Sequence, residues 1–485
     1  MAEPRTHTDS FTGMLRRAVQ RLRPRHPAAG AARGGDPWWK HSVIYEIYLR
    51  SFQDSDGDGV GDLGGVVQRL DYLEALGVDA IWITPLYPSP EVDFGYDISD
   101  YRAIDPQFGT LADFDRLILE AAKRGIRVLL DMVLNHTSEQ HPWFVEAARS
   151  RNSPHHGFYV WSDGRTDADG RRLRAMIDTY PGRRVLVGET YLPSTADLDA
   201  WYGGVHHNEL HLPMDTLVGL GSTLDATTFR QRLMEAATEI HDSQPLLVFD
   251  NHDRPRSWDR YGDGAHDAQI ARIIATLLLT SRAAVLLYQG EEIGQRTSPP
   301  KRVEDVRDPM GIRGWPRVKG RDGERTPMQW DAGPQAGFSR SQHPWLPVAA
   351  GYERINVHSE TADPGSLLNW HRHLIAMRRS YAALRSGVMV MLEPDSPSVL
   401  SYARVAADGA AMVVALNMSA APQTLTVDLA AAGVACRSLA TLLSSPPGIA
   451  SIEAGGSVTL PPYAAWVAAV HGHDPDAADE PCSRR

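Results

Sequence analysis

Short apolar runs alternate with amphipathic segments along most of the chain. Runs rich in β-branched and aromatic residues at 42–49, 79–84 and 126–134 predict buried strands, and helical periods at 66–77 and 111–125 predict helices that each end at a glycine. Strands that alternate with helices in this way indicate parallel βα units. The pattern continues in four later apolar runs, at 184–190, 208–214, 245–253 and 283–292.

A different pattern begins after a long helix predicted at 366–386. Residues 388–470 alternate apolar and polar positions in short runs separated by Gly and Pro, which predicts a small antiparallel β-sandwich. The predicted organisation is a barrel-type domain at 38–387 followed by this sandwich. Residues 1–37 are expected to form a disordered basic arm, with seven Arg against three acidic residues, and 471–485 a polar tail.

The class of fold follows from where the polar residues stand relative to the strands. Polar clusters at the carboxyl ends of many parallel strands are typical of a (β/α)8 barrel. The alternative is a doubly wound open sheet, but no glycine-rich phosphate-binding string follows the first strand, which argues against a dinucleotide-binding fold. We therefore predict an α/β protein with a (β/α)8 barrel and a C-terminal β-sandwich.

Composition narrows the functional classes. The 485 residues include 49 Lys plus Arg and 60 Asp plus Glu, a net charge of −11, so nucleic acid is not expected as the main partner. No run reaches the roughly 18 apolar residues that a transmembrane helix needs. Cys436 and Cys482 are the two cysteines, and they give no disulfide framework, which fits a reducing cytoplasm. The sequence does not indicate an oligomeric state.

Carboxylates and imidazoles stand at the ends of three predicted strands. Asp131 and His136 follow one strand, Glu189 follows the next, and His252 and Asp253 follow a third. On a barrel these side chains would converge on one pocket, where shifted carboxyl pKa values suit general-acid chemistry on a neutral polar substrate. Each acid could alternatively cap the helix that follows its strand, but three such ends together favour a site.

Six strings resemble the motifs of one known family. The strings are YEIYLRSF (45–52), GYDISDY (95–101), DMVLNHTS (131–138), VGET (187–190), FDNHD (249–253) and RTPMQWD (325–331). They are similar to motifs of the α-amylase family of glycoside hydrolases (glycoside hydrolase family 13), and the last string favours its cytoplasmic α-glucosidase and oligo-1,6-glucosidase branch. The resemblance implies retaining hydrolysis of α-glucosidic bonds in short oligosaccharides.

The resemblance also implies roles for individual residues. Glu189 would be the general acid/base, and Asp253 would stabilise the transition state by binding hydroxyls of the distorted sugar. Sugar-binding roles are implied for Asp93, Tyr96, His136, Phe144, His252 and Arg256.

An acidic loop at 54–62 predicts a cation site. Four aspartates stand at alternate positions with glycines between them, and such a cluster repels itself unless a hard cation neutralises it. The loop is an incomplete helix–loop–helix calcium motif because position twelve is Gly65, but the resembled family has a metal loop here. The expected cofactor is calcium, with magnesium or a plain solvated turn as alternatives. The expected ligands are Asp54, Asp56, Asp58, Asp62 and the Val60 carbonyl.

One required part of the resembled family is missing. The catalytic nucleophile follows the fourth strand in a string close to G-F-R-x-D, which this chain lacks, and only 57 residues separate Asp131 from Glu189. We therefore predict a barrel without strand four and without most of the family's inserted domain, of which 132–170 is the remnant. The predicted join is near 162–170, where Asp163, Asp167 and Asp169 are interpreted as turn residues.

The missing nucleophile leaves several functions open. The chain could be a non-catalytic sugar-binding protein, a truncated or misassembled reading of a longer gene, or an enzyme in which an acid from the join acts as a surrogate. A trehalose synthase-like glycosyl transfer is a further alternative. In each case a small oligosaccharide is the expected ligand.

Overall fold

The structure is a computed structural model that describes residues 36–159, 170–180, 184–240, 243–393, 395–435, 438–453 and 455–471. Almost all of the predicted basic arm and tail, the predicted join with its three aspartates, and both cysteines lie outside the described residues. No helix of the described residues is long and apolar enough to cross a membrane.

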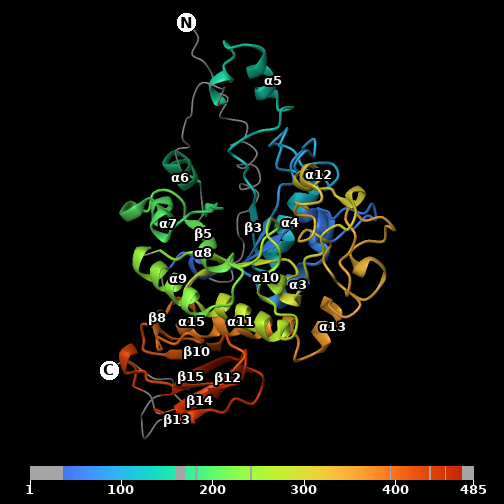
Figure 1. Ribbon diagram of the computed structural model, residues 1–485. Coiled ribbons are helices and arrows are strands. Elements are labelled where there is room, and N and C mark those ends of the chain that lie inside the picture. The colour runs from blue at the N-terminus through green and yellow to red at the C-terminus, as the bar shows by residue number, and fades with distance from the viewer. Residues whose placement is uncertain are drawn as a thin grey trace.

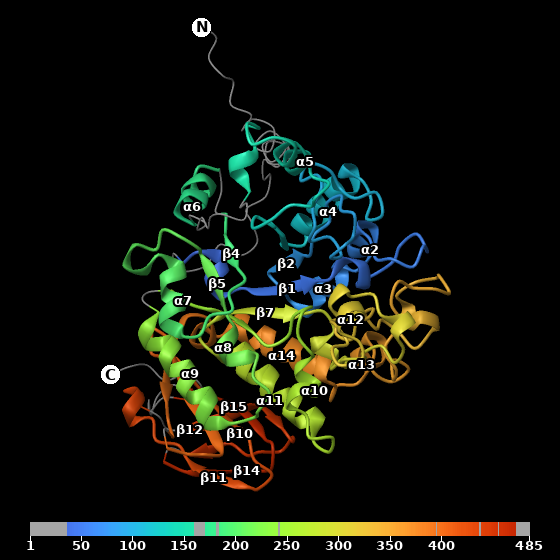
Figure 2. The same cartoon turned by 45° about the horizontal axis from the view of Figure 1, so that its top comes forward.

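Seven parallel strands form one curled sheet (Figures 1 and 2). Its order is β3-β2-β1-β7-β6-β5-β4, and the inner strand β1 pairs with both β2 and β7. Every pairing is parallel, as the alternation of strands and helices predicted. The strands are β1 Val43–Ile47, β2 Ala80–Ile83, β3 Arg127–Leu130, β4 Val187–Gly188, β5 Leu212–Asp215, β6 Leu246–Val248 and β7 Ala284–Tyr288.

Helices connect the strands and cover the sheet. Helix α4 begins with a reciprocal capping box between Thr110 and Asp113, and α3 ends at Gly77, whose φ of 95° favours glycine. The predicted helix at 66–77 is divided at Arg69, and the one at 366–386 at Tyr381. The α-helices are α2 Leu63–Gln68, α3 Leu70–Leu76, α4 Leu111–Lys123, α5 Pro142–Arg149, α6 Gly170–Asp178, α7 Thr195–Tyr202, α8 Thr216–Gly219, α9 Ala226–Glu239, α10 Ser257–Tyr261, α11 Asp267–Thr280, α12 Pro309–Gly314, α13 Val357–Ala362, α14 Leu367–Ser380 and α15 Ala382–Ser386.

The sheet is open between β3 and β4. Within the described residues no strand lies between these two in the chain, and each is an edge of the sheet. All four residues of β3 are only half-buried, whereas every residue of the inner strands β1 and β7 is buried. The prediction of a (β/α)8-type barrel that lacks its fourth strand is confirmed. Helix α5 lies at the top of Figure 1, away from the sheet.

The C-terminal region folds into two antiparallel sheets. Six strands have the order β13-β12-β15-β10-β9-β8, and β11 pairs with β14. Trp466, fully buried, lies in a core that both sheets share. The predicted antiparallel sandwich is confirmed. Its strands are β8 Val388–Met391, β9 Val399–Val405, β10 Ala411–Asn417, β11 Gln423–Thr426, β12 Ser438–Ser445, β13 Ile452–Glu453, β14 Ser457–Leu460 and β15 Ala465–His471.

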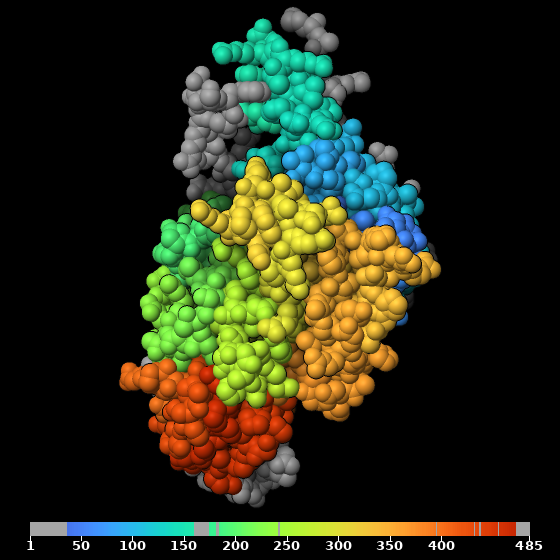
Figure 3. All heavy atoms as spheres, turned by 45° about the vertical axis from the view of Figure 1, so that its right-hand side comes forward, coloured from blue at the N-terminus to red at the C-terminus, as the bar shows by residue number. Residues whose placement is uncertain are grey.

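Polar contacts fix the sandwich to the barrel helices, below which it lies in orange and red (Figure 3). Arg230 of α9 donates to the carbonyl oxygens of Ser396 and Val399 at 2.6 and 2.7 Å. The hydroxyls of Thr280, at the end of α11, and Tyr402 are 2.6 Å apart. These buried bonds hold the two regions in one orientation.

Candidate active site

The candidate site lies where the carboxyl ends of the parallel strands meet, the position of the active site in barrel enzymes. Glu46 lies near the end of β1, Asp131 directly follows β3 and Glu189 directly follows β4. His252 and Asp253 are on the loop after β6. The curl of the sheet brings these segments together although they are far apart in sequence.

His252 is the centre of the site and is almost completely buried. Its Nδ1 is 2.6 Å from Glu46 Oε1, and its Nε2 is 3.0 Å from the Tyr96 hydroxyl. The ring lies between the rings of Tyr48 and Tyr96, with centroid distances of 5.5 and 5.6 Å. Burial opposes a charge on this ring, but the carboxylates of Asp253 and Glu46 outweigh it and raise the pKa of His252 to about 9.

Asp253 is held by two arginines that the sequence interpretation missed. Its Oδ1 accepts from Arg325 Nη2 at 2.6 Å and from Arg321 Nη1 at 3.0 Å. Arg321 also donates to Asp93 and Asp308, both at 2.9 Å. Burial would raise the pKa of Asp253, but His252 and the two arginines lower it well below its usual range. A permanently ionised carboxylate of this kind can accept hydrogen bonds from sugar hydroxyls.

Glu189 lies at the exposed side of the site. Tyr191 donates to Glu189 Oε1 at 2.8 Å, and Asn251 donates to the Tyr191 oxygen at 3.0 Å, which ties Glu189 to the loop after β6. Asp131 accepts from the Tyr96 hydroxyl at 3.0 Å. Burial raises the pKa of Asp131 to about 6, and the charge of Glu189 adds to this rise.

Three predicted sugar-binding residues lie in other settings. His136 is exposed, and its Nε2 is 2.9 Å from the Tyr96 backbone oxygen, so it borders the site. Phe144, on α5, packs against Tyr159 with ring centroids 5.1 Å apart. Arg256 is fully buried and donates to two backbone oxygens, of Gln289 at 2.8 Å and Glu324 at 3.0 Å. The guanidinium of Arg256 therefore supports two loops, and its sugar-binding role stays a prediction. Arg321 is the arginine that reaches Asp93 and Asp253.

Glu46 was also missed, although the sequence holds a signal for it. It is a carboxylate inside an apolar strand and is completely buried. A buried charge requires a partner, and His252 supplies one. Burial raises the pKa of Glu46, and the hydrogen bond with His252 offsets part of that rise.

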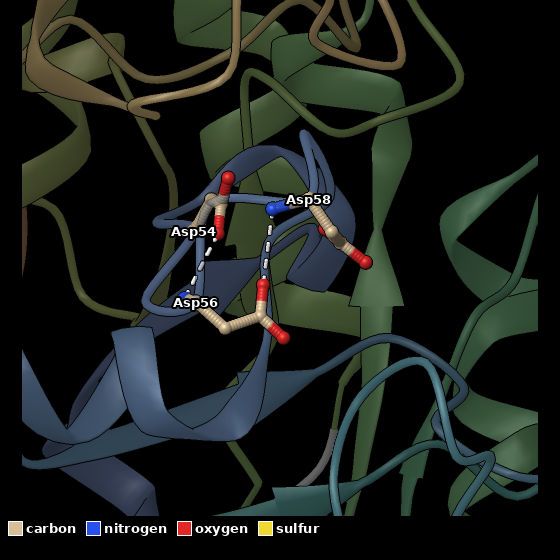
Figure 4. Close-up of side chains that lie close together, drawn as sticks. All are labelled: Asp54, Asp56 and Asp58. Carbon is tan, nitrogen blue, oxygen red and sulfur yellow. Dashed lines mark hydrogen bonds between the residues drawn. The ribbon is translucent and has the colours of Figure 1, made fainter.

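The acidic loop brings three of its four aspartates together (Figure 4). Carboxylate oxygens of Asp54, Asp56 and Asp58 lie within 4.8 Å of one another. Asp62 is outside this cluster because it caps α2, accepting from the Gly65 amide at 2.7 Å. The amide of Val60 donates to Asp58 at 2.7 Å. Three carboxylate oxygen donors at this spacing fit a hard cation such as Ca²⁺.

A barrel-type sheet with carboxylates and an imidazole at its carboxyl end is the arrangement of a barrel-enzyme active site. Comparison with known proteins then gives the family. The model described as "Alpha amylase, catalytic domain" matches residues 46–184 and 171–387, so the chain belongs to the α-amylase family of glycoside hydrolases.

Relatives of known name agree with this family. The chain is 33% identical to a probable alpha-glucosidase of Rhizobium meliloti, over 76% of this chain and 87% of that protein. It is 32% identical to an oligo-1,6-glucosidase of Heyndrickxia coagulans, over 79% and 92% of the two chains. Among solved structures, it is similar to the trehalulose synthase MutB of Pseudomonas mesoacidophila MX-45, with a TM-score of 0.79, 27% identity, and 90% and 100% of the two chains covered.

These comparisons also bear on the missing segment. The family model matches in two stretches, which overlap at residues 171–184, close to the predicted join. The alignment with the Rhizobium protein runs over 482 positions yet uses only 76% of this 485-residue chain, so it contains long gaps on this chain's side. Both findings agree with the open sheet between β3 and β4.

Proposed function

We propose that this chain binds the terminal glucosyl unit of short α-glucosides and that its hydrolysis of them is strongly reduced. The observation that carries the proposal is the coexistence of an intact polar network around His252 and Asp253 with a sheet that lacks the fourth strand. The first feature supports sugar recognition, and the second removes the element that carries the nucleophile in the resembled family.

Each residue of the network has a chemical task in this proposal. The Asp93–Arg321 pair and the ionised Asp253 bind sugar hydroxyls, and Tyr96 offers an aromatic face to the ring. His252 Nε2 donates a hydrogen bond to the Tyr96 hydroxyl and so holds that ring in place. Glu189, exposed beside the pocket, is positioned to protonate a glycosidic oxygen.

Retaining hydrolysis requires a second carboxylate that attacks the opposite face of the sugar. The acids described around the pocket are already engaged: Glu46 with His252, Asp131 with Tyr96, and Asp253 with two arginines. Loss of a nucleophile lowers rates by several orders of magnitude. We therefore expect sugar binding to persist where turnover does not.

Two measurements test this proposal. Titration calorimetry with maltose and isomaltose should detect binding that Asp253→Asn abolishes, while the exposed change Asp408→Asn leaves it intact. Release of p-nitrophenol from p-nitrophenyl α-glucoside should stay near background and rise when concentrated sodium formate supplies an external nucleophile. Because p-nitrophenolate leaves without protonation, Glu189→Gln should leave that release largely unchanged. Formate-independent turnover at the rate of an ordinary glucosidase would overturn the impairment, and absence of sugar binding would overturn the whole proposal.

Glucosyl transfer is a second candidate, supported by the similarity to MutB and to the alpha-glucosyl transfer enzyme XgtA, which is 31% identical with a TM-score of 0.79. Chromatography of maltose incubated with the chain would distinguish the two. Isomeric disaccharides or longer glucosides would favour transfer, and glucose alone would favour hydrolysis.

We further propose calcium as the cation of Asp54, Asp56 and Asp58, supported by the clustering of their oxygens. In that role the ion would neutralise the loop, with no part in the reaction. A cytoplasmic location is proposed from the low cysteine content.

A further inference from the structure

A chain of hydrogen bonds crosses the floor of the candidate site from β1 to the open edge of the sheet. Glu46 Oε1 is 2.6 Å from His252 Nδ1, His252 Nε2 is 3.0 Å from the Tyr96 hydroxyl, and that hydroxyl is 3.0 Å from Asp131 Oδ2. The four residues come from β1, the loop after β6, the loop after β2 and the end of β3. The chain of bonds therefore links side chains from four segments that the sheet places at one end.

The direction of each bond can be deduced from its two ends. Above about pH 6 Asp131 is ionised, so it can only accept, and the Tyr96 hydroxyl must donate to it. The Tyr96 oxygen then accepts from His252 Nε2. Burial raises the pKa of Glu46, but the hydrogen bond with His252 favours its ionised form, which can only accept, so His252 Nδ1 donates to it. Both ring nitrogens therefore carry hydrogen, and His252 is an imidazolium.

We propose that Glu46 is a positioning residue that holds His252 doubly protonated, so that Nε2 always donates to the Tyr96 hydroxyl and fixes the Tyr96 ring at the sugar-binding side of the site. This inference rests on the proposed sugar-binding function and names the residue that sets its electrostatics. Glu46 acts through His252, since it lies inside β1 and is completely buried.

A role limited to filling the core does not explain a carboxylate at this position. A buried charge is expensive unless it is paired, and Glu46 Oε2 has no hydrogen-bond partner among the described residues. A glutamine would have nearly the same shape and could still accept from Nδ1. What the glutamate adds is negative charge beside the ring, and His252 is the group to which that charge is hydrogen-bonded.

Other groups also face His252 and define what the test must separate. Asp253 Oδ1 lies 3.5 Å from Nε2, and the positive charge of Arg325 opposes protonation of the ring. Tyr48 stacks on one face of the ring and Trp82 approaches its edge. Since these groups remain in a Glu46 variant, any change in the titration of His252 reports on Glu46. The facing titratable and charged groups are Glu46, Tyr48, Tyr96, Asp131, Asp253 and Arg325.

The test is the titration of His252 in protein labelled at its histidine ring carbons, with the signal assigned by its loss in His252→Gln. We expect a midpoint near 9 in the unaltered chain and a midpoint at least about one pH unit lower in Glu46→Gln. Glu46→Asp keeps the charge on a shorter side chain and should titrate between the two. Glu239→Gln, at the exposed end of α9, is the matched control and should leave the midpoint unchanged.

Maltose binding supplies a second readout. The affinity of the unaltered chain should stay level from pH 6 to pH 8, whereas Glu46→Gln should bind at least about twofold more weakly at pH 8 than at pH 6, because a midpoint near 8 leaves about half of His252 protonated there. An unchanged His252 midpoint in the Gln and Asp variants would overturn the proposal. If Glu46→Gln does not fold, the Asp variant alone decides it. The titration needs no ligand, so failure of the unaltered chain to bind maltose would refute the proposed function without deciding the role of Glu46.

Discussion

Replacing Asp253 by Asn removes a carboxylate that three positively charged side chains share. Its Oδ1 lies 2.6 Å from Arg325, 3.0 Å from Arg321 and 3.5 Å from His252 Nε2. The asparagine keeps the shape but leaves these cations facing a neutral amide. The variant should therefore lose stability as well as the proposed sugar binding.

The size of the loss follows from how buried the carboxylate is. Breaking a fully buried ion pair costs about 3–5 kcal/mol. The Asp253 side chain is 29% exposed, and Arg321 retains Asp93 and Asp308, so we expect a smaller loss of about 2 kcal/mol in the free energy of unfolding at pH 7. Urea unfolding followed by tryptophan fluorescence measures this difference.

The pH dependence of that loss has a definite sign. Because the folded chain lowers the pKa of Asp253 below its ordinary 3.8, its stabilising contribution is complete well above that pH and declines as the pH falls below it. Each pH unit below 3.8 should remove about 1.4 kcal/mol of the difference between the two proteins. Asp408→Asn is an exposed change of the same chemistry in the sandwich. Its free energy of unfolding should equal that of the unaltered chain both at pH 7 and below pH 3.8. Equal stability of Asp253→Asn and the unaltered chain at pH 7 would refute the reasoning.

Three further outcomes are expected. Asp131→Asn should raise the melting temperature at pH 8 but not at pH 4. The fold raises the pKa of Asp131 from its ordinary 3.8 to about 6, so ionising this carboxyl destabilises the fold as the pH rises through that range. Equal shifts in melting temperature at both pH values would contradict this. Millimolar calcium should raise the melting temperature of the unaltered chain and not that of Asp56→Ala, and a shift in both would place the ion elsewhere. Arg378→Met should lower the free energy of unfolding by about 3 kcal/mol in urea titrations. The reason is that the fully buried guanidinium donates to four backbone oxygens, of His41, Leu279, Ser281 and Ala283. A loss below about 1 kcal/mol would show that those carbonyls find other donors.

The strands of this protein could be predicted because a buried strand is a continuous run of apolar residues in the sequence. The apolar runs around β1, β2 and β7 report that both faces of each strand are covered, and the polar residues that follow report the end of the strand. The spacing between Asp131 and Glu189 likewise predicted a missing strand, since a βα unit has a minimum length.

The pairing of charges could not be predicted in the same way. Glu46 and His252 lie 206 positions apart in the chain, and nothing next to Glu46 in the sequence indicates that partner. A place in the site is implied for Arg256 by resemblance alone, and in the structure its guanidinium donates to the oxygens of Gln289 and Glu324. A hydrophobic period says whether a side chain is buried, and tertiary structure decides which charge it meets.

The pairing of β1 with both β2 and β7 has a mechanical consequence. In a closed barrel any two strands are connected by two routes around the ring, so one weakened seam leaves the other. In the open sheet described here only one route joins β3 to β4, and it passes through β1. A force or a mutation that separated β1 from either neighbour would divide the sheet into two smaller sheets, one ending at β3 and the other at β4. Each inner strand, including the strand β1 that carries Glu46, is thus a place where the continuity of the sheet depends on two strand pairings alone.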